Sequence, residues 1–316
     1  MTNKELYSQF VAEEKNLPIY MQPWWLDAVC AGKQWDVMLV NDNSGQTVAA
    51  MPYLLRKRSM FRYVLVPQQT QISGVWVAER VANNPQMLRH IAVEIKKFLQ
   101  TLKLSYYYQQ YPIESLMPEQ MKSLGFGISR RVTYRVPQTR LQDLDALLDS
   151  FSKNKKRQLQ KALTLKADTQ MNIEDFYRFC AECMKEKGER ISFTREFLLV
   201  LYQKTQRLQQ SQLLRIQTAD GITAAASLLL WDNNSMYFFF PCFSMTYKDA
   251  GANTLLAWEA LKTAHEKNLS FDFVGSMKRS WANEYKQFGA EPTPYFAVRK
   301  YYNPLFAFAL LINKFR

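Results

Sequence analysis

The sequence predicts an α/β (α+β) fold made of two copies of one unit, each a mixed, mostly antiparallel sheet flanked by helices. Two observations lead to this prediction. Strand and helix patterns follow one another in the same order in the two halves of the chain. The length of 316 residues also corresponds to two domains of roughly 150 residues each. We place the units at residues 1–135 and 136–316.

The first half opens with a short helix and continues with strands that form a hairpin. Asn43, Ser44 and Gly45 make a turn cluster between two apolar, strand-like runs. A longer helix follows, because Asn84 can cap it, Pro85 suits its first turn, and apolar residues then recur at helical spacing. We expect helices over 20–31, 84–103 and 118–124, and strands over 36–41, 47–55, 61–66, 72–77 and 104–111.

The second half repeats this order after a helical stretch. Turn signals at Asp220-Gly221 and Asn233-Asn234 separate three strand-like runs. We expect strands over 213–218, 222–231, 235–243 and 269–275, and helices within 141–165, 172–189, 194–209 and 252–267, with a short helix ending at Gly289. Residues 47–50, 104–106 and 121–125 resemble 223–226, 269–271 and 285–289 in the same order, which indicates a duplication.

The charge of the chain favours an anionic partner. Lysine and arginine number 41 against 28 acids, a formal net charge of +13. A positive field of this kind attracts nucleic acid, phosphorylated metabolites or an anionic membrane face. Four cysteines exclude a disulfide-rich scaffold, and two distant histidines argue against a histidine metal site, so we expect no metal.

The two ends of the chain bear on its location. The N-terminus has no apolar signal core, and no apolar run is long enough to span a bilayer, so we expect a cytoplasmic protein. The C-terminal stretch 301–316 is apolar with a basic end. It either packs on the sheet or lies on an anionic membrane face with Lys314 and Arg316 at headgroup level.

The loop before the helix at 252–267 carries a candidate phosphate site. A helix N-terminus offers unpaired N–H groups and the positive end of a dipole. Gly251 and Ala252 would let a ligand approach the backbone closely, and Lys248 would add charge. We therefore predict cofactor binding by Lys248, Gly251, Ala252 and Asn253. The alternative is an ordinary helix start capped by Asn253.

Two charged residues near the C-terminus could serve a reaction. Asp272 alternates with two phenylalanines, so it lies on the other face of its strand and could act as a general base. Lys286 could stabilise a developing oxyanion, and Tyr285 beside it could contact the substrate. The alternatives are a hydrogen-bonded structural aspartate and a solvated helix lysine, as Lys122 at the matching place in the first half suggests.

The stretch 153–166 is basic and contains no acid. A solvated helix usually mixes signs, so this run is typical of a surface for phosphates or RNA. We predict that Lys153, Lys156 and Arg157 steer an anionic donor or acceptor. The alternative is a basic surface helix without a ligand.

Several stretches resemble the FemAB/FemX-type acyltransferases, a branch of the acetyltransferase (GNAT) superfamily built from two tandem acetyltransferase-like units. The likeness covers about residues 130–300, and the stretches that carry it are 150–163, 175–188, 193–202, 271–276 and 284–300. The pattern Lys248-x-x-Gly251-x-Asn253 also resembles the pyrophosphate loop of the Gcn5-related acetyltransferases, with Asn253 where a small residue is usual.

The resemblance implies transfer of an acyl or aminoacyl group to an amine by direct attack, without a metal or a covalent enzyme intermediate. It implies a catalytic Lys286, on the lysine of a Phe-Lys-x-x-Phe-Gly stretch, and places Asp272 on the preceding strand. The donor would be acyl-CoA or aminoacyl-tRNA, and the acceptor an amine-bearing molecule such as a cell-wall precursor. We expect the first unit to be non-catalytic. An aminoacyl-tRNA-dependent peptidyltransferase and a non-catalytic module that binds anions or RNA stay open as alternatives.

Overall fold

The computed structural model describes residues 1–14, 16–30, 35–275, 277 and 279–311. The chain forms two compact units: unit 1 contains residues 1–131 and 294–316, and unit 2 contains residues 132–293. The sequence predicted a single boundary after residue 135, whereas the structure assigns the C-terminal segment to unit 1. Lys314 and Arg316, for which we predicted headgroup contacts, lie outside the described residues.

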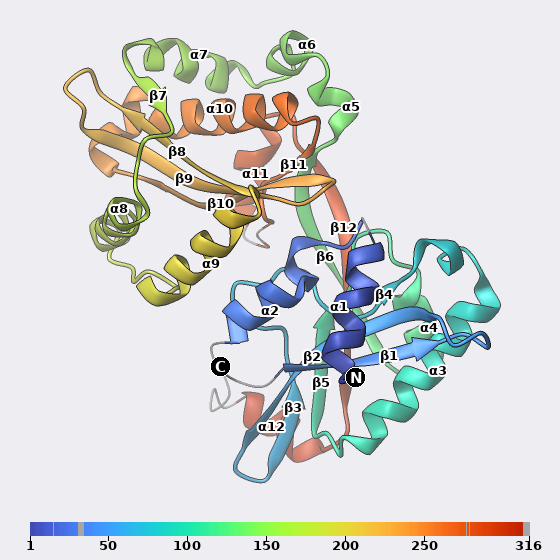
Figure 1. The fold of residues 1–316 in the computed structure, drawn as a ribbon. Coiled ribbons are helices and arrows are strands. Elements are labelled where there is room, and N and C mark those ends of the chain that lie inside the picture. The colour runs from blue at the N-terminus through green and yellow to red at the C-terminus, as the bar shows by residue number, and fades with distance from the viewer. Residues whose placement is uncertain (15, 31–34, 276, 278, 312–316) are drawn as a thin grey trace. The chain divides into compact units, whose positions relative to one another are not determined.

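The sheet of unit 1 has the strand order β1-β2-β3-β5-β12, and β4 pairs with β2 (Figure 1). All its pairs are antiparallel except β3 with β5, which is parallel. The strands are β1 (Trp35–Asn41), β2 (Thr47–Arg58), β3 (Phe61–Val64), β4 (Trp76–Val77), β5 (Tyr106–Gln110) and β12 (Glu291–Tyr301). The helices are α1 (Asn3–Glu13), α2 (Pro23–Cys30), α3 (Pro85–Thr101), α4 (Met117–Ser123) and α12 (Pro304–Leu311), with short 3₁₀ turns η1 (Ile19–Met21) and η2 (Glu79–Val81).

The sheet of unit 2 has the order β6-β11-β10-β9-β8-β7, with α7 and α10 on one face and α8 and α9 on the other (Figure 1). The strands are β6 (Gly127–Val136), β7 (Lys166–Asp168), β8 (Ser211–Gln217), β9 (Thr223–Trp231), β10 (Ser235–Phe243) and β11 (Ser270–Asp272). The helices are α5 (Gln138–Leu141), α6 (Leu144–Asp149), α7 (Lys153–Lys161), α8 (Ile173–Glu186), α9 (Arg195–Arg207), α10 (Ala252–Glu266) and α11 (Arg279–Lys286), with 3₁₀ turns η3 (Ala162–Thr164) and η4 (Met245–Ala250).

The two units repeat one topology. In unit 1 a meander of β1, β2 and β3 is followed by α3 and then by β5, which is parallel to β3. In unit 2 a meander of β8, β9 and β10 is followed by α10 and then by β11, which is parallel to β10. This confirms the predicted fold class, a mixed and mostly antiparallel sheet flanked by helices that occurs twice in the chain.

Each crossover helix is held by an apolar face. In α3, Leu88, Ile91, Ile95 and Leu99 recur at helical spacing and are all buried. The Asn84 side chain accepts hydrogen bonds from the first-turn backbone, as the sequence predicted. Burying one such aliphatic side chain contributes about 1.5–3 kcal/mol, so this face anchors the helix to the sheet.

The strands around the crossover in unit 2 separate early. β10 pairs with β11 over only three residues, Ser235–Tyr237 with Ser270–Asp272. The register of β10 then shifts beyond Phe239, and Phe240 has a positive φ of 51°. The sequence predicted a strand over 269–275, but β11 ends at Asp272 because Val274 also has a positive φ, 53°. β10 therefore continues to Phe243 without β11 beside it.

Within the described part of the chain, no helix has both the length and the apolar character needed to cross a bilayer. The same residues contain no cluster of histidine, cysteine, aspartate or glutamate side chains that could hold a metal ion.

Candidate functional site

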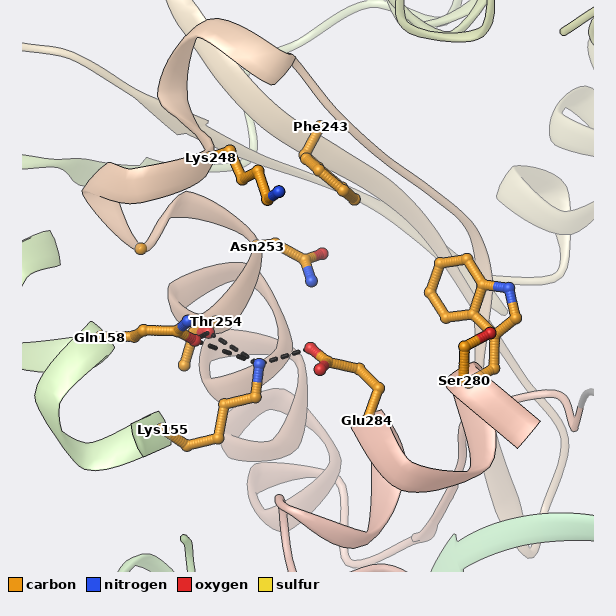
Figure 2. Close-up of a pocket in the computed structure, with 10 residues that line it drawn as sticks. Lys155, Gln158, Phe243, Lys248, Asn253, Thr254, Ser280 and Glu284 are labelled. Carbon is orange, nitrogen blue, oxygen red and sulfur yellow. Dashed lines mark hydrogen bonds and ion pairs between the residues drawn. The ribbon is translucent and has the colours of Figure 1, made fainter. Parts of the chain in front are cut away.

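A cavity of about 380 Å³ lies in unit 2 beside the start of α10 (Figure 2). It is lined by residues of α7, the end of β10, the η4–α10 loop and α11, four segments far apart in the sequence. The lining residues are Lys155, Gln158, Phe243, Lys248, Gly251, Asn253, Thr254, Ser280, Trp281 and Glu284.

The start of α10 gives the cavity a wall suited to an anion. Gly251 is the N-cap residue, and no side chain caps the helix there. The first-turn N–H groups of a helix have no partner within it and carry the positive end of its dipole. Lys248 and Asn253 line the same cavity (Figure 2). The structure thus brings together three of the four residues predicted to bind the cofactor, while Ala252 is buried in the core.

The structure explains the glycine at position 251 differently from the sequence analysis. The φ of Gly251 is +80°, a left-handed conformation that favours glycine. A Cβ built on it would overlap the backbone carbonyl of Gln158 and lie 3.3 Å from the Cβ of Ala162. The space above the missing side chain is therefore filled by the C-terminal end of α7, and not left for the close approach of a ligand.

Lys155 is one of the cavity residues that the sequence analysis did not predict, and Glu284 is another. The Lys155 ammonium is 3.1 Å from the Gln158 Oε1 and 3.3 Å from the Thr254 Oγ1, and it forms an ion pair with Glu284 (Figure 2). It also lies 4.6 Å from the centre of the Phe288 ring. An ammonium has three N–H donors, and these three oxygens accept all of them.

The basic stretch 153–166 contains a weak sequence signal that Lys155 is buried. Lys155, Leu159 and Ala162 are spaced by four and three residues, which places them on one helix face. That face packs on α10, so the lysine is 2% exposed. Lys153 and Arg157 are exposed, and Lys156 is half-exposed and pairs with Asp149. None of these three predicted anion-binding residues lines the cavity.

Glu284 presents a carboxylate to the cavity. Its side chain is 28% exposed, and one of its oxygens is held by Lys155. Lys155 is buried and Glu284 is partly exposed, so losing one partner costs less than the roughly 3–5 kcal/mol typical of a fully buried pair. The Lys155–Glu284 pair therefore fixes both the floor of the cavity and the position of a potential proton acceptor.

Asp272 is buried and bonded away from the lining residues. Its Oδ1 accepts hydrogen bonds from the Thr133 hydroxyl at 2.6 Å and from the Val274 N–H at 2.8 Å. Its Oδ2 lies 3.8 Å from the Arg135 Nε. Burial raises the pKa of Asp272 and outweighs the guanidinium and hydrogen bonds, which lower it. These contacts hold the turn that ends β11.

The Asp272→Asn variant tests this effect of burial. The folded chain holds a proton on Asp272 at pH values where the unfolded chain has lost it, so this group stabilises the fold less as pH rises above its ordinary value of 3.8. An asparagine Oδ1 can still accept from Thr133 and Val274 but does not titrate. We expect the wild-type stability to fall relative to that of the variant as pH rises from about 4, measured by urea unfolding. A difference independent of pH would contradict the raised pKa.

Lys286 and Tyr285 lie elsewhere on α11. Lys286 is exposed and does not line the cavity. It follows Glu284 by two residues, about 200° around the helix, so it points away from the cavity side. Tyr285 is buried, with its ring stacked 4.7 Å from Phe273, and burial raises its pKa.

The residue spacing around Lys286 explains in part why this lysine does not line the cavity. The resemblance rests on a Phe-Lys-x-x-Phe-Gly stretch, whereas this chain has one residue between Lys286 and Phe288. Counting back from Phe288, Tyr285 occupies the place of the lysine. One residue turns a helix by about 100°, so Lys286 points in a different direction from the lysine of that stretch.

Comparison with known proteins identifies the fold. A family model described as an acetyltransferase (GNAT) domain matches residues 126–287. No curated protein sequence matches the chain. A crystal structure of FemX is similar over 99% of both chains, with 15% identity and a TM-score of 0.74.

Two further structures share the fold at lower similarity. The structure of L-PGS from Bacillus licheniformis covers 98% of this chain and 96% of its own, with 13% identity and a TM-score of 0.54. A tandem GNAT protein from the clavulanic acid biosynthesis pathway covers 94% and 93%, with 11% identity and a TM-score of 0.51.

Proposed function

This chain belongs to the acetyltransferase (GNAT) domain family, and we propose that unit 2 transfers an acyl or aminoacyl group from an anionic donor to an amine. One observation carries the proposal. A single cavity combines a helix N-terminus and Lys248, which suit phosphate, with the carboxylate of Glu284, which suits proton transfer. Unit 1 would support the fold without taking part in the reaction.

The donor is acyl-CoA or aminoacyl-tRNA. Both carry phosphates, so both suit the start of α10 with Lys248 and Asn253. The likeness to FemX and to L-PGS favours an aminoacyl donor and an acceptor related to the cell wall or to a lipid. The family description favours acyl-CoA.

The cavity residues divide the chemistry among them. An amine that attacks an ester or thioester carbonyl must lose a proton, and the leaving oxygen or sulfur must gain one. Glu284 is the acid of the lining and would accept the proton from the amine. Lys155 has its three donors occupied, so it acts as a positioning residue that orients Glu284. Asp272, the base expected from the sequence, instead stabilises the turn that ends β11.

Loss of the Lys248 ammonium is expected to weaken donor binding. A charge-assisted bond to phosphate is worth about 1.5–3 kcal/mol, so Lys248→Ala should raise the Kd by about tenfold or more. Calorimetric titration with acetyl-CoA and with an aminoacyl-tRNA measures it and also identifies the donor. Lys286→Ala is the matched control and should change the Kd less than twofold.

Two results would change this proposal. Weaker binding in Lys286→Ala but not in Lys248→Ala would place the donor elsewhere. Binding of tRNA without any transfer to an amine would indicate the non-catalytic RNA-binding alternative.

A further inference from the structure

One edge of unit 1 gathers basic side chains from three separate segments. The Ser105 N–H donates to the Arg62 carbonyl at 2.6 Å, and the Tyr302 N–H donates to the Ser105 carbonyl at 3.0 Å. The β2–β3 hairpin, the start of β5 and the end of β12 therefore lie side by side, and α12 follows there (Figure 1). The register puts Lys57 and Arg62 on one face of this end of the sheet, and Arg58, Arg299, Tyr301 and α12 on the other. We call this end of the sheet, with both of its faces, the basic edge and define it by Lys57, Arg58, Met60, Arg62, Lys103, Arg299, Tyr301 and Leu305.

The basic edge carries an excess of positive charge in its sequence. Residues 54–64, 95–108 and 292–311 contain no aspartate or glutamate. The register of β2 and β3 places Lys57 directly opposite Arg62, an arrangement of like charges that destabilises a strand pair. Within the residues that the structure describes, no ion pair neutralises Lys57, Arg62 or Lys103. An anionic partner would relieve this repulsion.

Two aliphatic side chains are exposed at the basic edge, one at the hairpin tip and one on the face that carries α12. Met60, at the tip of the β2–β3 hairpin, is 73% exposed, and Leu305 in the first turn of α12 is 62% exposed. Phe306, the next residue, is fully buried and packs 5.4 Å from the rings of Tyr63 and Tyr106. This contact holds α12 against the sheet with Leu305 facing outward.

We propose that the basic edge docks unit 1 on an anionic membrane surface. Basic side chains beside exposed aliphatic ones fit the headgroup–acyl boundary, where charge and apolar burial act together. Single-stranded RNA instead needs open aromatic faces for stacking. The ring of Tyr301 already packs 4.6 Å from that of Tyr106, so it offers less of such a face. The exposed Met60 and Leu305 thus favour lipid over single-stranded RNA, and they add nothing to the phosphate contacts that a structured RNA would make.

Vesicle sedimentation tests the proposal with the whole chain of 316 residues. Vesicles of phosphatidylcholine with phosphatidylglycerol should bind it, and vesicles of phosphatidylcholine alone should not. A basic residue near an anionic membrane strengthens binding about fivefold, so Lys57→Gln with Arg62→Gln should weaken it about 25-fold. The control, Lys153→Gln with Arg157→Gln on α7, removes the same charge from unit 2 and should leave binding unchanged.

A second variant separates lipid from RNA. Met60→Ser keeps every charge, so it should weaken vesicle binding severalfold and leave tRNA binding unchanged. Its melting temperature should equal that of the wild type, because Met60 is exposed. The proposal is overturned if anionic vesicles do not bind, if Met60→Ser binds them as the wild type does, or if the α7 control loses binding equally.

Discussion

The Glu284→Gln variant is expected to lose transfer activity by about 100-fold or more, with donor affinity nearly unchanged. Glutamine has almost the same shape but accepts no proton, and a positioned general base contributes about 10²–10⁴-fold. Steady-state kcat and a separate donor titration measure the two quantities. Glu266→Gln, an exposed acid at the far end of α10, is the control and should behave as the wild type.

The same variant tests the role given to Lys155. If Lys155 acts by holding Glu284, then Lys155→Met should lower kcat in the wild-type background. In the Glu284→Gln background it should lower kcat little further. Residues that act as a unit are not additive in this way. Additive losses would show that Lys155 contributes independently, and an active Glu284→Gln variant would remove Glu284 from the reaction.

The Gly251→Ala variant is expected to destabilise unit 2 by about 2–5 kcal/mol. The substitution forces a non-glycine residue into a left-handed conformation, at about 1–2 kcal/mol. It also drives a methyl group into the Gln158 carbonyl, and overpacking of this kind adds about 1–3 kcal/mol. Urea unfolding followed by the fluorescence of the seven tryptophans of the chain measures the change.

The Gly45→Ala variant separates the conformational contribution from the steric one. Gly45 has a φ of +86°, and a Cβ built there meets no atom within 4 Å. This variant therefore loses only the conformational contribution, about 1–2 kcal/mol. Equal effects at Gly45 and Gly251 would mean that α7 yields readily and that its packing against the start of α10 is loose.

The elements of the fold could be predicted because their signals are local. The cap at Asn84 and the apolar spacing of α3 sit within one stretch of sequence, and the strand over 235–243 has the predicted bounds. The repeated order of elements also disclosed the duplication. The unit boundary differed because β12, at the end of the chain, pairs with β5, a contact that no local pattern reveals.

The site was harder to predict because its residues meet only in three dimensions. Lys248 and Asn253 lie near the start of α10 in sequence, so a local pattern was enough to name them as candidates. Lys155 and Glu284 are 129 residues apart, and each looks like an ordinary charged helix residue. The basic run drew attention to its exposed members, whereas the buried lysine is the one that reaches the cavity.

Blocking the cavity is the most direct test of the account. Ser280 is exposed and lines the cavity, so Ser280→Trp should fill it without disturbing the core. Asn283→Trp, on the same helix but outside the lining, is the matched control. The account predicts that calorimetry finds donor binding lost in Ser280→Trp and retained in Asn283→Trp, with both melting temperatures unchanged. Wild-type donor affinity in Ser280→Trp would contradict it.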